Sequence, residues 1–162
     1  DMNNVVEFEK ECLPCYGRVL HLCERMMGSR AQAEELAQDT YLRAFQKRST
    51  FRGESSVSTW VLRIAYRLCL DSSKRQQRQV AWPEHEVVDE TAQRAEYARL
   101  YSLALLSRLS ERSRSVLILK AGLELSYAEI GRVLDLPVNQ VGVYLQRARK
   151  EALQIARAEG LL

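Results

Sequence analysis

The sequence predicts an all-α fold of two small helical domains, a helix bundle and a helix-turn-helix, joined by a flexible linker. Apolar side chains recur at steps of three and four residues through most of the chain, which is the spacing of one helix face. No segment shows the alternating pattern rich in Val, Ile and Thr that is typical of a strand. The helical spacing is lost between residues 76 and 91, where Trp82-Pro83 and several acidic residues occur. We therefore expect domains at residues 1–78 and 94–162 and a linker at residues 79–93.

Three helical segments are expected in the first domain. The first covers residues 5–27 and is interrupted at Pro14, because proline lacks the amide hydrogen and crowds the preceding turn. The second covers residues 29–47 and begins with a capping serine. The third covers residues 57–78 and follows a turn-like stretch. Its apolar stripe includes Trp60, so we expect this side chain to pack in the core rather than stack on a base.

The second domain is expected to begin with two helices, over residues 94–109 and 111–120. Ser110 lies at the capping position of the second of these helices. Gly122 is expected to end it, since glycine is common just beyond a helix C-terminus.

The end of the chain has the pattern of a helix-turn-helix. Ser126 and Glu129 have the spacing of a capping box for a short helix over residues 127–134. Residues 135–137 form a turn, and Asn139 is expected to cap a final helix with a basic outer face. Such a pair of helices fits the major groove of DNA. The alternative is an ordinary helical hairpin whose Arg and Lys side chains are solvated.

Charge and composition exclude several classes of protein. The net charge of +3 is small, but residues 43–78 hold nine Lys and Arg against two acidic residues, which suits a phosphate backbone. No apolar run reaches the ~18 residues of a membrane span and no secretory signal is recognisable, so we expect a cytoplasmic protein. No Gly-rich phosphate loop, Ser/His/Asp set or pair of catalytic carboxylates is evident. We expect neither enzymatic activity nor a cofactor.

The four cysteines raise a separate question. Cys12, Cys15 and Cys23, together with His21, superficially resemble a metal-binding cluster, and Cys69 stands apart. One tetrahedral zinc would require a broken helix, because Cys23 and His21 lie about two turns beyond the first pair. Reduced, buried thiols are therefore the expectation, and no metal site is predicted. A metal-responsive interaction protein is kept as a minor alternative.

Four motifs in order across both domains resemble an extracytoplasmic-function (ECF) sigma factor of bacterial RNA polymerase, a group of the sigma-70 family. The resemblance covers nearly the whole chain and includes sigma regions 2 and 4. It is carried by Phe8-Glu9, by AEELAQDTYLRAF at residues 33–45, by FRGESS at residues 51–56, by STWVLRIA at residues 58–65 and by GLELSYAEIG at residues 122–131.

The resemblance implies that the helix over residues 33–46 binds the clamp helices of the largest subunit of core RNA polymerase. The residues assigned to this contact are Glu35, Gln38, Asp39 and Leu42. An acidic ridge beside a leucine can pair with a basic partner helix. Without the resemblance, acidic residues at a helix start are explained by the helix dipole alone.

The resemblance also implies that the loop at residues 51–58 and the helix after it capture and open the minus-10 promoter element. A pocket for an unstacked base and cations along the displaced strand are what melting requires. The residues assigned to this role are Arg52, Ser55, Ser56, Arg63, Arg67, Asp71, Lys74 and Arg75. Arg67 stands where the family often has asparagine, so its base preference is left open.

The final helix would bind the minus-35 element. The residues assigned to this contact are Asn139, Gln140, Tyr144, Arg147 and Arg149. Gly142 and Tyr144 stand where the family commonly has basic residues that face the groove. Fewer phosphate contacts predict weaker and less salt-sensitive binding.

These assignments predict an alternative sigma factor that directs promoter recognition, promoter melting and transcription initiation. Its expected partners are core RNA polymerase, promoter DNA and an anti-sigma factor, membrane-anchored or not, that holds it inactive. The chain itself is not expected to insert into a membrane. The alternative function is a free-standing helix-turn-helix regulator that acts without core polymerase.

Overall fold

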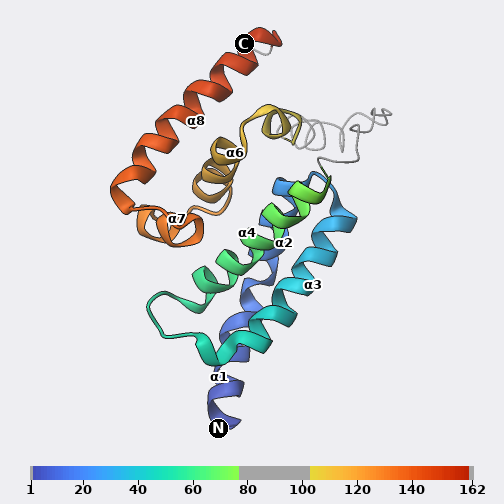
Figure 1. The fold of residues 1–162 in the computed structure, drawn as a ribbon, viewed down its shortest axis with the longest axis vertical. Coiled ribbons are helices and arrows are strands. Elements are labelled where there is room, and N and C mark those ends of the chain that lie inside the picture. Colours follow the sequence, from blue (N-terminus) through green and yellow to red (C-terminus); the bar gives the residue numbers. More distant parts are fainter. Residues whose placement is uncertain (1, 77–102, 161–162) are drawn as a thin grey trace, which may run out of the picture.

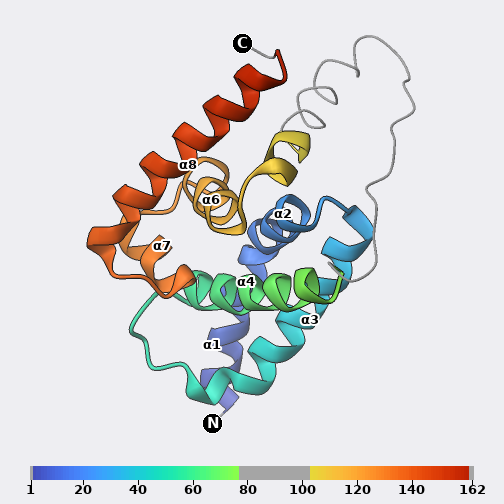
Figure 2. The ribbon, with the colours of Figure 1, turned by 45° about the horizontal axis from the view of Figure 1, so that its top comes forward.

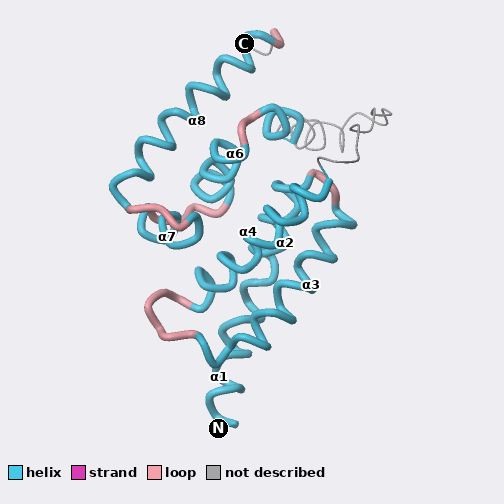
Figure 3. The backbone as a smooth tube through the Cα atoms, viewed as in Figure 1, coloured by secondary structure: helices cyan, strands magenta, loops and turns pink. Residues whose placement is uncertain are grey.

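The computed structural model describes residues 2–76 and 103–160. Within these two stretches every regular element is a helix, as the apolar spacing predicts, and no strand is present (Figure 3). The helices of residues 2–76 form a bundle, and those of residues 103–160 pack along one side of it (Figure 1). The expected linker at residues 79–93 and the start of the helix expected at residues 94–109 lie outside the described residues.

The first predicted helix is divided into three elements. These are α1 (Met2–Cys12), the 3₁₀ turn η1 (Leu13–Cys15) and α2 (Tyr16–Met27). Pro14 lies within η1, which confirms the break predicted at this proline. Gly28 follows α2 with φ of 68°, a left-handed conformation that glycine adopts without steric cost.

Two long helices complete the bundle. The helix α3 (Arg30–Lys47) is capped by Ser29, whose hydroxyl oxygen accepts a backbone N–H of the first turn. A 3₁₀ turn, η2 (Arg48–Thr50), and the loop at residues 51–56 then lead to α4 (Val57–Gln76). Both helices begin and end close to the residues that the sequence predicts.

The second described stretch contains five helical segments. Residues 103–108 are helical and are followed by α6 (Glu111–Leu117). A π-helical turn, η3 (Ile118–Gly122), extends α6 without a break. The helix-turn-helix consists of α7 (Tyr127–Leu134) and α8 (Val138–Ala158), and the predicted capping box at the start of α7 is present.

Two turns in this half differ from the prediction. Pro137, not Asn139, occupies the N-cap position of α8, so Asn139 lies inside the first helical turn. Proline fixes its own φ near the helical value and lets the next residue enter the helix directly. Gly122 does end the helical stretch, but its φ is not positive; the left-handed residue is Glu124, with φ of 55°.

The two halves share one continuous hydrophobic core, which the helical spacing alone did not predict. The helix α4 packs against α1, α2 and α3 in its own half and against α7 in the other (Figure 2). Side chains with no exposed surface come from both halves, and include Val19, Leu22, Val61, Leu62, Val116, Leu119 and Ile130. A side-chain contact also joins the halves: the Ser115 hydroxyl of α6 donates to Sδ of Met26 on α2 (3.8 Å).

Arg114 of α6 connects the two halves through backbone carbonyl groups. Its Nε donates to the Leu106 carbonyl (2.7 Å), and Nη2 donates to those of Ser107 (3.3 Å) and Leu109 (3.2 Å). Its Nη1 donates to the Met26 carbonyl at the end of α2 (3.5 Å). The carbonyls at a helix C-terminus lack partners within the helix and carry partial negative charge, so a guanidinium group stabilises them.

Glu151 connects the C-terminal half of α8 to the start of α6. Its carboxylate accepts hydrogen bonds from the Ser110 amide (2.6 Å), the Ser110 hydroxyl (3.0 Å) and the Ser113 hydroxyl. Burial opposes ionisation of this carboxyl group, but the hydrogen bonds prevail and lower its pKa below the usual range. Glu151 therefore helps to set the position of α8 relative to α6.

Replacing Glu151 by glutamine should lower the free energy of unfolding by about 1 kcal/mol at neutral pH, because a charge-assisted acceptor is lost. A carboxyl group with a lowered pKa stabilises the fold above its unfolded pKa, and this contribution is lost as the pH falls through the folded pKa. The difference between Glu151→Gln and the original chain should therefore vanish in acid. Urea unfolding at neutral and acidic pH measures it, with Glu7→Gln as the exposed control; a difference that persists in acid would contradict this role.

Candidate functional site

The loop at residues 51–56 and the start of α4 form the wall of a hollow of about 150 Å³. The lining residues are Thr50, Phe51, Arg52, Glu54, Ser55, Thr59, Trp60, Arg63 and Arg132. Three of them are arginines, which come from the loop, from α4 and from α7. Guanidinium, hydroxyl and aromatic groups around one hollow suit an unstacked base and its phosphate.

An aromatic cluster supports this hollow. The Trp60 ring centroid lies 5.7 Å from that of Phe8 in an edge-to-face arrangement and 5.5 Å from that of Phe51. Such tilted contacts are favourable aromatic geometries. Trp60 is half-buried and packs against the core as the sequence predicts, yet it also lines the hollow.

The two serines assigned to minus-10 binding have different surroundings. Ser55 lines the hollow, whereas Ser56 does not. The Ser56 hydroxyl accepts the Thr59 N–H (3.1 Å) and donates to the Thr59 hydroxyl (3.0 Å), so it acts as a cap at the start of α4. Gly53 turns the loop with φ of 73°. Arg52 is exposed at the same loop and reaches the hollow.

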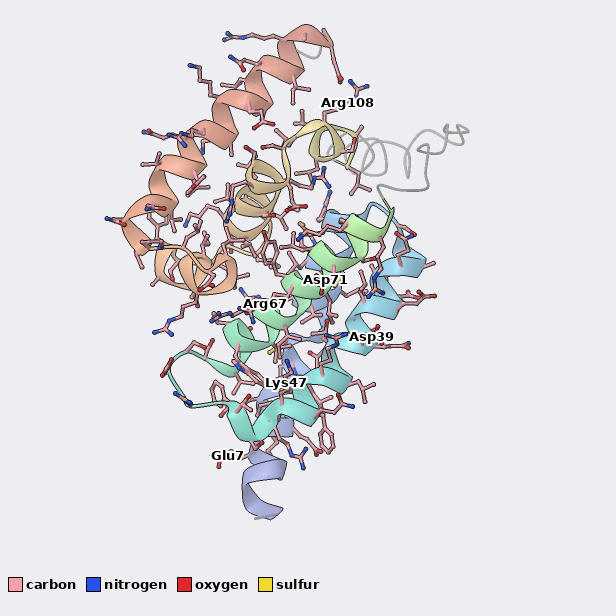
Figure 4. The ribbon with its side chains drawn as sticks, viewed as in Figure 1. Glu7, Asp39, Lys47, Arg67, Asp71 and Arg108 are labelled. Atoms are coloured by element: carbon pink, nitrogen blue, oxygen red, sulfur yellow. The ribbon has the colours of Figure 1, made fainter. Side chains whose placement is uncertain are left out.

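The basic residues of α4 are distributed along its outer side. Arg63 lies at the hollow, and its Nη2 is 3.5 Å from Oδ1 of Asp135, which follows α7. Four exposed residues continue along the helix beyond Arg63, and two of them are labelled in Figure 4. They are Arg67, Asp71, Lys74 and Arg75. The helix thus presents a mainly basic strip that begins at the hollow.

The residues assigned to polymerase binding share the outer face of α3. Glu35, Gln38, Asp39 and Leu42 are all exposed, and Leu42 retains 57% of its surface. The buried side of the helix is formed by Ala33, Leu36, Ala37, Thr40 and Ala44. Asp39 projects from α3 away from the bundle (Figure 4). We name the set Glu35, Gln38, Asp39 and Leu42 the α3 ridge.

Phe45 adds an aromatic group beside the α3 ridge. The helical spacing places it on the buried stripe, but 44% of its surface is exposed. The Arg48 guanidinium lies 4.1 Å from the centre of its ring, which is a cation–π contact. The sequence did not predict an exposed aromatic side chain here, because helical spacing does not distinguish residues in the middle of the buried face of α3 from residues at the edge of that face.

The first half of α8 presents most of the assigned minus-35 residues to solvent. Asn139, Gln140, Arg147 and Arg149 are exposed, and the opposite side is buried at Val141, Leu145 and Ala148. Tyr144 is half-buried, with its ring 5.4 Å from the Arg112 guanidinium and 5.9 Å from that of Arg147. Tyr144 therefore packs α8 against α6, whether or not it also contacts DNA.

The members of the suspected metal cluster lie apart. Cys23 on α2 lies beside Cys69 on α4, and His21 faces Gly122. No group of three His, Cys, Asp or Glu side chains suited to a metal ion occurs within residues 2–76 or 103–160. Burial, reinforced by the charge of Cys15, raises the pKa of Cys12 to about 11. Metal binding at Cys12 would therefore have to displace a firmly held proton.

Comparison with known proteins identifies the family. The sequence matches Sigma-70 region 2 over residues 14–79 and Sigma-70, region 4 over residues 100–151. It is 33% identical to the ECF RNA polymerase sigma factor SigG of Mycobacterium tuberculosis, over 93% of this chain and 49% of SigG. It is 30% identical to the ECF RNA polymerase sigma factor SigW of Bacillus subtilis, over 85% of this chain and 81% of SigW. The chain belongs to the ECF sigma factors. It spans about half the length of SigG.

Two solved structures share the fold of both halves. The sigma factor RpoE from Bartonella quintana, solved with the anti-sigma factor NepR, superposes with a TM-score of 0.71 at 18% identity, over 93% of this chain and 97% of RpoE. CnrH, solved with the cytosolic domain of CnrY, superposes with a TM-score of 0.70 at 25% identity, over 93% of this chain and 88% of CnrH. Both superpositions therefore include both halves of the chain.

The family match divides the described elements between two sigma regions. Region 2 includes α2, α3 and α4, and so contains the α3 ridge, the loop and the basic strip. Region 4 includes α6, α7 and most of α8. In the part of this sigma factor that the structure describes, no helix is long and apolar enough to cross a bilayer.

Proposed function

We propose that this sigma factor binds core RNA polymerase and directs promoter recognition, promoter melting and transcription initiation, and that it has no enzymatic activity of its own. The observation that carries the proposal is the hollow at the start of α4, continued by a basic strip along the same helix. Region 2 is assigned to residues 1–78 and region 4 to residues 94–162, with a linker between them.

The geometry supports melting without an energy source. An unstacked base enters the hollow, where the Ser55 and Thr59 hydroxyls and the Trp60 ring are available to it. The displaced strand then follows Arg67 and Lys74, which are exposed beyond the hollow. Binding energy released on these contacts stabilises the open strand rather than the duplex.

The two remaining contacts use the α3 ridge and α8. An exposed leucine beside acidic side chains fits a partner helix with basic and apolar residues, such as the clamp helices of the largest polymerase subunit. The exposed start of α8 fits the major groove at the minus-35 element. The similar structure of RpoE is that of a sigma factor bound to an anti-sigma factor, which supports control of this chain by an anti-sigma factor.

Transcription reconstituted with core polymerase and a promoter library tests the proposal. Defined start sites that require both core polymerase and this chain support a sigma factor. Tight binding to a duplex operator without core polymerase, and no defined starts with it, would instead establish the helix-turn-helix regulator.

Replacing Asp39 by lysine together with Leu42 by alanine should weaken binding to core polymerase by about tenfold or more, because both side chains project from the α3 ridge. Titration of labelled core polymerase measures the affinity, and circular dichroism checks the fold. The matched control is Glu7→Lys, a charge reversal at an exposed residue of α1 (Figure 4). Unchanged affinity in the folded double variant would remove the ridge from the interface.

Replacing Arg67 and Lys74 by alanine should reduce minus-10 melting more than core binding, because these cations meet DNA only after the complex with polymerase has formed. Permanganate reactivity of unpaired thymines reports the bubble. Lys10→Ala, at an exposed position on α1, should leave the reactivity unchanged. A bubble of normal reactivity in the double variant would exclude the basic strip from melting.

Gln140→Ala should change which minus-35 sequence is preferred, whereas Arg147→Ala should lower binding to all sequences about equally. Gln140 lies in the first turn of α8, where an amide reaches a base edge, and Arg147 lies two turns farther along, beside the phosphates. Transcription from a panel of minus-35 variants separates the two effects. A uniform loss for Gln140→Ala and a selective loss for Arg147→Ala would reverse the roles.

A further inference from the structure

The outer face of α8 is exposed over the first half of the helix. The opposite face is buried at Val141, Leu145 and Ala148, and this packing sets the rotation of the helix about its axis. The exposed side chains follow one another at helical spacing, so they form one face, which meets the DNA when α8 enters the major groove. We name this set the α8 face; it consists of Asn139, Gln140, Val143, Gln146 and Arg147.

The first part of the α8 face carries no charge. Residues 138–146 contain no Lys, Arg, Asp or Glu. Val143 lies near the middle of the face, and 46% of its surface is exposed. Asn139 and Gln140 lie one turn before it, whereas the neighbouring Gly142 adds no side chain. This part of the helix therefore offers amide groups and an apolar group to the bases, and no cation.

Arg147 is the first cation along the α8 face. Its guanidinium lies 5.9 Å from the centre of the Tyr144 ring, and the guanidinium of Arg112 on α6 lies 5.4 Å from the same ring. Tyr144 is half-buried, at the border between the exposed and the buried sides of α8. The contact therefore places the Arg147 guanidinium toward the edge of the face, which suits a phosphate contact.

Base pairs differ in the groups that they present in the major groove. Guanine presents two acceptors, which Arg or Lys binds, whereas adenine presents an acceptor and a donor, which pair with the amide of Asn or Gln. Thymine presents a methyl group, which apolar side chains contact. Four residues of α-helix rise about 6 Å, which is close to two base-pair steps of about 3.4 Å each. Asn139 and Val143 are therefore spaced to reach neighbouring base pairs.

We propose that the minus-35 element of this sigma factor is rich in A·T pairs, with the amides of Asn139 and Gln140 bound to adenine and the Val143 side chain against the methyl group of a neighbouring thymine. This inference rests on the proposed function and specifies the DNA that region 4 recognises. A G·C pair opposite residues 139–143 finds neither a cation for guanine nor a carboxylate for cytosine. Arg147 binds the phosphate backbone and selects no base.

Transcription with core polymerase from a promoter library randomised at the minus-35 positions tests the inference. The original chain should select A·T pairs at two or more adjacent positions. Gln140→Arg should change the selected base at one of these positions from adenine to guanine, because a guanidinium pairs with the two guanine acceptors. If the original chain selects G·C at the position that responds to Gln140→Arg, adenine is not the base that Gln140 reads, and the inference is wrong.

Replacing thymine by deoxyuridine in the selected minus-35 sequence removes only the methyl group. Fluorescence anisotropy of the labelled promoter duplex with polymerase that carries the original chain should show an affinity about fourfold lower, the factor expected for exposure of one buried methyl group. With Val143→Ala, thymine and deoxyuridine should bind equally. Leu153→Ala is the matched control, because Leu153 is similarly exposed (48%) but lies ten residues farther along α8, so the fourfold difference should remain.

Circular dichroism checks that each variant remains helical. Equal affinity of the original chain for thymine and deoxyuridine would overturn the methyl contact. A loss with deoxyuridine that persists in Val143→Ala would assign that contact to another side chain and would equally overturn the role of Val143.

The library also distinguishes failure of this inference from failure of the proposed function. Defined starts without selection of A·T pairs would support a sigma factor and overturn only the A·T preference. If no library member yields defined starts with the original chain and core polymerase, the sigma function fails, and the inference about its minus-35 element fails with it.

Discussion

The burial of α4 is the constraint on which the rest of the structure depends. Val61, Leu62 and Ala65 have no exposed surface, and the helix contacts α1, α2, α3 and α7. Removing so much apolar surface from water fixes the rotation of the helix about its axis. With that rotation Arg67 lies on the exposed side of α4, so the position of the basic strip is set by the packing of the buried residues of the same helix.

Local signals allowed most of the helices to be predicted. Pro14, Gly28 and Ser126 act within one turn of chain, so their effects on helix ends follow from the residue alone. Asn139 was assigned to the N-cap because asparagine favours that position. In the structure Pro137 occupies the N-cap, and α8 begins directly after it at Val138. Gly122 ends the helical stretch as predicted, but its contact with His21, about a hundred residues earlier in the chain, could not be read from the sequence: a Cβ atom at Gly122 would lie 2.9 Å from Nε2 of His21.

The sequence indicated the basic residues of the candidate site but not the set of residues that line its hollow. The basic residues of α4 could be identified because a local excess of Lys and Arg is visible in the sequence itself. Arg132 and Phe8 could not be connected with the loop at residues 51–56, since each comes from an element distant in the chain. The boundary between the two regions could be predicted because the helical spacing is lost there. The shared core could not be predicted, because it is formed by contacts between residues that are distant in the sequence.

The four cysteines have a consequence for the chemical reactivity of the chain. All of them are buried in the first half, and a hydrogen bond to Cys23, together with burial, raises the pKa of Cys69. Because all four side chains are buried, alkylating reagents reach these thiols only when the bundle opens locally. The rate of thiol alkylation therefore measures opening of the bundle around α1, η1, α2 and α4, while α6 and α8 contribute no signal. A single cysteine introduced on the outer face of α8 would then be labelled selectively, with the native thiols left in place.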